Sequence, residues 1–497
     1  MGVIRSMVAL HLLAIIVYGD HDHTSHSCIH DSLDFPPTPS SRSRLLYYAS
    51  SFDHPPLEKH HPPSSDDRKL EDVSVDDARK SPLRIHVYYD IKIPTDQTNF
   101  IKNTIMPPSV EFWSQALAVF PVQNNLLFDR TCSSTFELPD GTKKCNKLND
   151  PETCGDAVLP VDWFKARESC TSCSTGGTCS GCVTSTGGVG LLLTDVALVV
   201  HVENTGHCSS SPSTLAYAYA CKWDQYDRPI LGHVNFCPAA SAASSQTLQI
   251  STAKHEIAHA LGFSSNSFPL MRHRDGKTPR TARDASTGAP AKSSVTCVDG
   301  TTKNIVIAAS SSLKHGPMRG IPNTFSIVTE TVRDVARHHF QCPSLEGIEV
   351  ENQPTSTGAC WGSHWEQRVL GTEAMTPVVS DDNPAISSFT LALFHDMGFY
   401  DVNFSKADPL LWGHKLGCDF VTKKCVQNGG TKVINENQGY FCNDTRTISC
   451  SHDLMAISGC DVRETTEDIS EVTMQYFTGA PKKGGEVAVL DYCPSFF

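Results

Sequence analysis

The sequence predicts an α+β fold, because both strand-like and helix-like patterns occur along its 497 residues. In the stretch 83–89, apolar and polar residues alternate and β-branched and aromatic residues are frequent, which is typical of a strand. The apolar stretches 191–193 and 196–202 indicate further strands of a sheet. Apolar residues recur at helical spacing over 110–120 and again over 248–261, so we expect a helix in each stretch.

Composition narrows the class of protein. Lys and Arg number 41 against 54 Asp and Glu, a net charge of −13, and without a basic run this argues against nucleic-acid binding. The 20 cysteines indicate an oxidising compartment. Arg5 followed by the apolar stretch 7–17 is typical of a secretory signal peptide, expected to span 1–18, and the stretch is too short for a membrane anchor. We therefore expect a secreted protein without a transmembrane segment beyond the signal peptide.

One motif carries most of the chemistry. His255, Glu256 and His259 form H-E-x-x-H, and on a helix the two histidines lie on the same face. Two imidazoles so placed can bind one zinc ion, and Glu256 can accept a proton from a zinc-bound water. Gly262 is typical of a helix end. A chance match on a surface helix is the alternative. The apolar stripe of this stretch supports a helix, and on a helix the motif favours a zinc site with one Zn²⁺ per chain.

The third zinc ligand is not fixed by this motif. A catalytic zinc takes three protein ligands, and the metzincin pattern would place the third histidine at position 265, which is Ser265. A ligand further along the chain is therefore required. Candidates are a downstream glutamate, as in thermolysin-type sites, or one of His273, His315, His338, His339 and His364. Met375 precedes Thr-Pro and can form the tight turn that marks metzincins, and His364 is the nearest upstream candidate.

The segment 19–83 differs from the rest of the chain. It is rich in His, Ser, Pro and Asp and does not build a core, so we expect a propeptide. Cys28 is the only cysteine before Cys132. A lone thiol in such a leader could supply a thiolate to the open zinc position and keep the enzyme latent, or it could be an ordinary disulfide partner.

Four cysteines form C-x2-C-x5-C-x2-C, namely Cys170, Cys173, Cys179 and Cys182. A zinc ribbon is one interpretation, but the gap between the pairs is too short for that kind of site. We therefore expect disulfides in a surface loop.

Two histidines in the strand region, His201 and His233, are expected to be structural rather than ligands. A strand that precedes the zinc helix is also a candidate edge for pairing with an extended peptide.

Several stretches together carry a family resemblance. They are Arg228–Gly232, His255–Ser264, Ala336–Cys342, Gly362–Glu366, Glu373–Pro377, Asp396–Tyr400 and Tyr492–Pro494. In combination they resemble the leishmanolysin (invadolysin) family of secreted or surface zinc endopeptidases. The resemblance covers roughly residue 83 to the end.

The resemblance implies a site and a domain order. It implies His364 as third ligand after a long insertion, Met375 as the Met-turn, and Cys28 as a propeptide cysteine switch. It implies a metzincin-like catalytic domain with a twisted sheet and the zinc helix over 84–264, and a central domain with the third ligand and Met-turn over 265–385. A cysteine-rich C-terminal domain follows over 386–497.

The expected function is that of a zinc endopeptidase made as a latent zymogen. Zinc-activated water attacks the peptide bond, Glu256 is the general base, and the substrates are proteins or peptides bound between the first two domains. The alternative is a non-catalytic secreted or adhesion protein that keeps the zinc-site scaffold. Cell-surface association is compatible with either function.

The C-terminal region carries two further expectations. Removal of Cys28 leaves 19 cysteines, and family members usually continue further, so either a partner lies in a missing tail or one thiol is free. No lipid-anchor signal is visible. Asn403 and Asn443 begin glycosylation sequons.

Overall fold

The computed structural model describes a defined part of the chain. The described residues are 26–27, 80–90, 95–138, 143–210, 214–239, 244–285, 288–353, 360–379, 384–451 and 457–496. The expected signal peptide, Cys28 and most of the expected propeptide lie outside the described residues.

A four-stranded mixed sheet lies in the N-terminal half of the chain. Its order is β12 (Ala216–Trp223), β13 (Pro229–Phe236), β11 (Val196–His201), β3 (Ile85–Tyr89). The strand β11 runs parallel to both β13 and β3, whereas β12 is antiparallel to β13. All residues of β11 are buried, as its continuous apolar sequence requires. The strand that directly precedes the predicted zinc helix, β13, is paired on both sides, so the edge beside it is β12.

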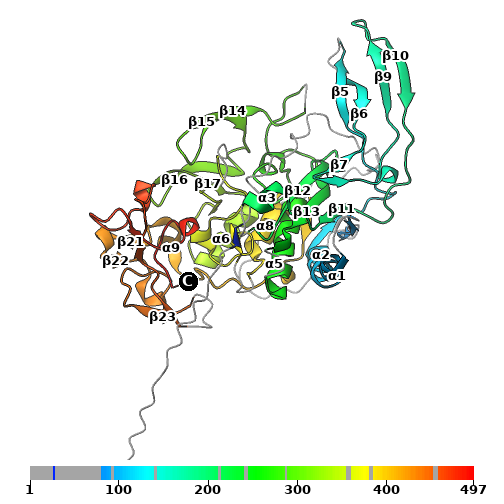
Figure 1. Cartoon of the computed structure of the whole chain (residues 1–497). Coiled ribbons are helices and arrows are strands. Elements are labelled where there is room, and N and C mark those ends of the chain that lie inside the picture. The colour runs from blue at the N-terminus through cyan, green and yellow to red at the C-terminus, as the bar shows by residue number, and fades with distance from the viewer. Residues whose placement is uncertain are drawn as a thin grey trace, which may run out of the picture.

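One helix lies against this sheet, and a second helix lies against the first. Helix α5 (Gln246–Leu261) packs on β12 and β13, and α2 (Met106–Ala116) packs on α5 (Figure 1). Gly232 allows the close approach of helix and sheet, because a Cβ there would lie 2.7 Å from the Cβ of Ala260. The indole nitrogen of Trp113 donates to the carbonyl of Lys254 over 2.9 Å and fixes α2 to α5.

Two local predictions are wrong: one helix has other ends than expected, and one expected strand is not a strand. The helix expected over 110–120 begins earlier and ends at Ala116, because β4 (Leu117–Val119) pairs with β2 (Ser81–Pro82) and β20 (Asp401–Val402). The strand expected over 191–193 is a turn after a single bridge at Leu191, and Leu193 has φ 51°.

Two hairpins project together from the body of the molecule (Figure 1). They consist of β5 (Cys132–Glu137) with β6 (Lys143–Leu148) and of β9 (Glu168–Cys173) with β10 (Cys179–Thr184). Disulfides Cys170–Cys182 and Cys173–Cys179 cross-link the second hairpin. The predicted surface disulfides are therefore confirmed in this loop.

The remaining helices and strands are mostly short and follow the zinc-helix region or connect the parts above. They are α1 (Thr95–Phe100), β7 (Thr153–Cys154), β8 (Ala157–Val158), α3 (Gly206–Ser210), β14 (Lys292–Thr296), β15 (Thr302–Val306), β16 (Leu313–Met318), β17 (Ile321–Ile327), α6 (Glu330–Phe340), β18 (Ile348–Glu349), α7 (Gln367–Leu370), β19 (Val378–Val379), α8 (Ser388–Asp396), α9 (Gly417–Thr422), β21 (Val426–Gln427), β22 (Lys432–Val433), β23 (Ile448–Cys450), β24 (Ile457–Gly459), β25 (Arg463–Glu464) and β26 (Lys483–Gly484).

The described residues mix helices and strands around one large core, which agrees with the expected fold class. The principal cluster of buried apolar side chains runs from Leu83 to Phe496, so it joins all three predicted domains, whose boundaries stay predictions. The disulfides are Cys132–Cys145, Cys154–Cys221, Cys170–Cys182, Cys173–Cys179, Cys208–Cys237, Cys297–Cys360, Cys342–Cys418, Cys425–Cys493 and Cys442–Cys460. Within the described part of the chain, Cys450 is exposed and unpaired.

One short piece of the leader has a described position. The strand β1 (His26–Ser27) pairs antiparallel with β19, so that His26 lies opposite Val379 and Ser27 opposite Val378. Strand β19 also contacts α5. The leader therefore reaches the neighbourhood of the predicted zinc helix.

Candidate metal centre

Helix α5 carries two of the predicted ligands. Ser245 caps its N-terminus by accepting from the backbone N–H of Leu248 over 3.1 Å. The helix ends at Gly262, whose φ of 120° is unfavourable for other residues. His255 and His259 are fully buried inside the molecule at 0% and 1% exposure, and Glu256 lies between them at 2%.

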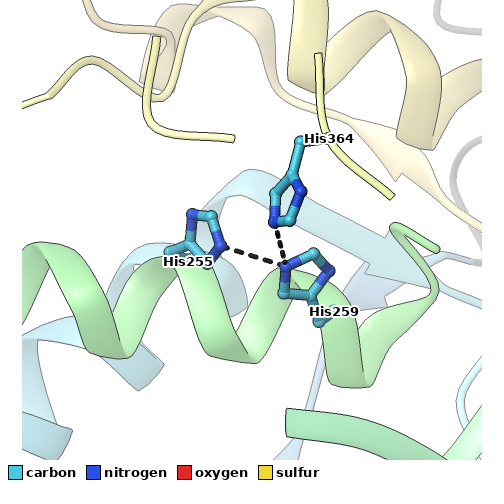
Figure 2. A group of neighbouring side chains, drawn as sticks. All are labelled: His255, His259 and His364. Carbon is cyan, nitrogen blue, oxygen red and sulfur yellow. Dashed lines mark hydrogen bonds between the residues drawn. The ribbon is translucent and has the colours of Figure 1, made fainter. Parts of the chain in front are cut away.

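His364 comes from a distant part of the chain, 105 residues after His259. Backbone hydrogen bonds hold the segment around His364 in place. The carbonyl of His364 accepts from the N–H of Glu351 over 2.8 Å, and the N–H of the next residue, Trp365, donates to the carbonyl of Met375 over 2.9 Å. These bonds place the imidazole of His364 above helix α5, facing the two histidines there (Figure 2).

The three imidazoles point the same ring nitrogen toward one another. The Nε2 atom of His259 lies 3.0 Å from Nε2 of His255 and 3.2 Å from Nε2 of His364, the two contacts dashed in Figure 2. Each Nδ1 faces outward and bonds an acceptor: Ala374 O at 2.5 Å for His255, Phe263 O at 2.6 Å for His259, and a Glu351 carboxylate oxygen at 2.7 Å for His364.

This pattern fixes the tautomers. A carbonyl or carboxylate oxygen only accepts, so each neutral ring carries its proton on Nδ1, and three Nε2 lone pairs converge. Burial, and then the neighbouring His364, lower the pKa of His255 to about 3, which keeps that ring neutral. Converging lone pairs in a buried site repel one another unless a cation lies between them.

The separations also fit zinc. Zn–N bonds of about 2.0–2.1 Å in tetrahedral geometry place ligand nitrogens about 3.3–3.4 Å apart, close to the observed 3.0 and 3.2 Å. Ligand atoms of His255, His259 and His364 all lie within 4.8 Å of one another. Three neutral imidazoles are a donor set that fits a catalytic zinc site.

Met375 lies directly beside this cluster. It is fully buried; its backbone N–H donates to a carboxylate oxygen of Glu373 over 2.5 Å, and its carbonyl accepts from Trp365. The preceding residue, Ala374, supplies the carbonyl that orients His255. The segment thus contacts both halves of the site, and its identity as a Met-turn stays a prediction.

The other histidines considered as third ligand lie elsewhere. His339 Nε2 bonds the carbonyl of Trp412 at 2.8 Å, and His315 stacks on Phe325 with its Nε2 3.1 Å from Asn323. Neither these residues nor His273 and His338 belong to a described group that could hold a metal with the two helix histidines; that group contains His364.

Three contacts at the site have no signal in the sequence. The rings are oriented by the carbonyls of Phe263 and Ala374 and by the carboxylate of Glu351. Every residue has a backbone carbonyl, so the first two have no signal in the sequence. Glu351 lies 13 residues before His364, a spacing that matches no motif. Only a known pairing of the segments around Glu351 and His364 would have identified that residue.

The two sequons differ in their surroundings. Asn403 is exposed, and the Ser405 hydroxyl donates to its side-chain oxygen over 2.7 Å. Asn443 is half-buried, and its side-chain nitrogen donates to the carbonyl of Gly430 over 2.9 Å. The nitrogen that would carry a glycan is therefore accessible at Asn403 and engaged at Asn443.

Within the described part of the chain, no helix combines the length and the apolar character that crossing a bilayer requires.

Comparison with known proteins assigns the family. The leishmanolysin family model matches residues 170–496. A leishmanolysin-like peptidase of Caenorhabditis elegans is 33% identical over 480 residues, which cover 90% of this chain and 70% of that protein. Its counterpart in Caenorhabditis briggsae is 32% identical over 469 residues, 88% of this chain and 69% of that protein. Leishmanolysin of Leishmania amazonensis is 32% identical over 312 residues, covering 62% of this chain and 42% of that protein. Peptidases of this family depend on zinc, and this chain belongs to the leishmanolysin family as a metalloendopeptidase.

Proposed function

We propose that this chain is a secreted zinc endopeptidase in which His255, His259 and His364 hold one Zn²⁺ and Glu256 is the general base. The observation that carries the proposal is the convergence of three buried Nε2 lone pairs. Neutral imidazoles fixed in this way are preorganised for a divalent cation, and no proton on Nε2 has to be displaced when it binds.

Each residue of the proposed site has a separate role in peptide-bond hydrolysis. Zinc, when bound, would polarise the substrate carbonyl and increase the acidity of a water molecule. Glu256 accepts the proton of the attacking water and then delivers it to the leaving amine. Glu256 follows His255 on helix α5 and is 2% exposed, so its carboxylate would act in a site from which bulk water is largely excluded. The edge strand β12, which contacts α5, is the candidate for pairing with an extended substrate.

The leader is proposed to keep the enzyme latent. The antiparallel pairing of β1 with β19 holds a piece of the leader beside the site, and Cys28 is the next residue in the chain. A thiolate at that point could occupy the open metal position. We expect the full chain carrying Cys28→Ala to cleave substrate without removal of the leader, whereas Ser27→Ala, its neighbour, should stay latent. Equal latency of both variants would contradict the switch.

Secretion is supported by the covalent framework. Disulfides distributed from Cys132 to Cys493 require an oxidising compartment. Asn403 is the sequon that we propose to be glycosylated first, since its amide is exposed. Detection of the chain in the medium of expressing cells tests secretion, and mass spectrometry of that chain with and without enzymatic deglycosylation tests the glycan at Asn403.

A single panel of proteins tests the main proposal. Zinc content and casein cleavage are measured for the leader-free parent, Glu256→Ala and His364→Ala. We expect about one zinc in the parent and in Glu256→Ala, cleavage by the parent alone, and loss of zinc in His364→Ala. Zinc retained by His364→Ala would favour a glutamate as third ligand, and zinc without cleavage in the parent would favour a binding or adhesion protein.

A further inference from the structure

We infer that Glu351 is a positioning residue of the metal centre, whose carboxylate orients His364 and strengthens its bond to the metal. The inference rests on the proposed role of His364 as a ligand. It concerns a residue that the H-E-x-x-H motif and its spacing do not include.

The outer contacts of the three histidines differ in charge. His255 and His259 donate from Nδ1 to backbone carbonyls, whereas His364 Nδ1 lies 2.7 Å from a carboxylate oxygen of Glu351. Both members of this pair are 1% exposed, so water does not screen their attraction. Within the triad, the Nδ1 contact of the histidine supplied from outside helix α5 is therefore to a carboxylate, whereas the other two are to carbonyls.

The backbone is shaped to deliver this carboxylate. Glu351 pairs with the ligand segment through two bonds, from its N–H to His364 O over 2.8 Å and from Gly362 N–H to its own carbonyl over 2.9 Å. A Cβ at Gly362 would lie 2.2 Å from the Glu351 carboxylate oxygen and 2.6 Å from its Cβ. The absence of a side chain at Gly362 thus lets the Glu351 side chain cross the neighbouring segment and reach the imidazole.

A carboxylate in this position has two effects on a ligand. By accepting the Nδ1 proton it holds the tautomer whose Nε2 lone pair faces the metal, and by polarising the ring it makes Nε2 a stronger donor. Its negative charge also offsets part of the charge of a divalent cation in a buried site. Such partners of metal-bound histidines typically change metal affinity by about 10–100-fold.

Glu349 offers a matched control in the same segment. It is buried at 2% exposure, two residues before Glu351, but its carboxylate lies 2.6 Å from Arg319 instead of a histidine. Removing its charge perturbs the same segment without touching the outer contact of His364.

The test measures zinc affinity of the full chain by competition with a chelator of known affinity. We expect Glu351→Gln, which keeps size and loses charge, to bind zinc about 10–100-fold more weakly than the parent, and Glu349→Gln to stay within about threefold. The visible spectrum of the cobalt-substituted protein should shift in Glu351→Gln and not in Glu349→Gln, a change that general destabilisation does not produce. Thermal unfolding of the metal-free proteins checks that the fold is retained.

The outcomes separate this inference from the proposed function. Zinc binding by Glu351→Gln within about threefold of the parent, or an equal loss in Glu349→Gln, would overturn the role of Glu351. A parent that binds no zinc would instead overturn the proposed metal site. If Glu351→Gln does not fold, Glu351→Asp decides: its charge is kept but the carboxylate is withdrawn from Nδ1, so the same weakening and spectral shift are expected, and parental affinity would refute the inference.

Discussion

Replacement of His233 should remove part of the acid sensitivity of this protein. His233 lies in strand β13 at 1% exposure, and its ring packs 5.1 Å from that of His201 and 5.2 Å from that of Tyr219. Burial, and then His201, lower the pKa of His233 from 6.5 to about 3. The ring is expected to be structural, and its environment accepts only the neutral form.

The sign and size follow from proton linkage. The unfolded chain binds a proton at His233 below its ordinary pKa of 6.5, whereas the folded chain does not until about pH 3, so acid favours unfolding between these values. The full difference corresponds to about 5 kcal/mol, of which about 2 kcal/mol is lost between pH 7 and pH 5. Above pH 6.5 the contribution to the free energy of unfolding is constant.

Urea unfolding of the metal-free parent, His233→Gln and His233→Phe at pH 7 and pH 5 measures this term. Both variants lack the titrating ring but differ in polarity, so each will have its own stability at pH 7. We expect the free energy of unfolding to fall between pH 7 and pH 5 by about 2 kcal/mol more in the parent than in either variant. Equal falls in all three proteins would refute the reasoning, because every other histidine is common to them.

Three further changes test how the site is supported. Ser245→Ala removes the cap of the zinc helix and should cost about 1 kcal/mol in urea unfolding, whereas Ser245→Asp should retain most of the stability. Gly232→Ala places a methyl group 2.7 Å from the Cβ of Ala260 and should cost about 1–3 kcal/mol, measured by the same unfolding experiment. Asp491→Asn removes the carboxylate that lies 2.8 Å from Arg319 in an almost fully buried pair. The unfolding midpoint should fall by the equivalent of about 3–5 kcal/mol. An unchanged midpoint would show that the buried Arg319 guanidinium is satisfied without this carboxylate.

Local patterns predicted the parts of the fold that local interactions determine. The zinc helix was predictable because an apolar stripe, a motif on one face and Gly262 at the end all lie within a single stretch. The end of α2 was not, because Leu117–Val119 becomes a strand only through pairing with segments near residues 81 and 401. The turn at Leu193 was missed for a related reason, since its run of leucines is compatible with a strand until its backbone angles are known.

The metal centre shows the same division between local and distant interactions. Spacing on one helix placed His255 and His259 together, but five histidines and a glutamate remained open as third ligand until the family resemblance favoured His364. The structure places His364 at the helix because two segments far along the chain pair through backbone hydrogen bonds near Glu351. No periodicity in the sequence encodes that pairing, so the contact that orients the third imidazole was invisible at that level.

The end of helix α5 is attached to the distant segment that carries the proposed third ligand. A short metzincin motif would supply its third histidine at position 265, and here that position is Ser265. Its backbone N–H donates to the hydroxyl of Ser363 over 2.9 Å, and the two hydroxyls lie 3.0 Å apart. Ser363 directly precedes His364, so these bonds attach the distant ligand segment where the nearby histidine would have been. The insertion can therefore be long, because the position of the proposed third ligand depends on this attachment and on Glu351 rather than on the length of chain between.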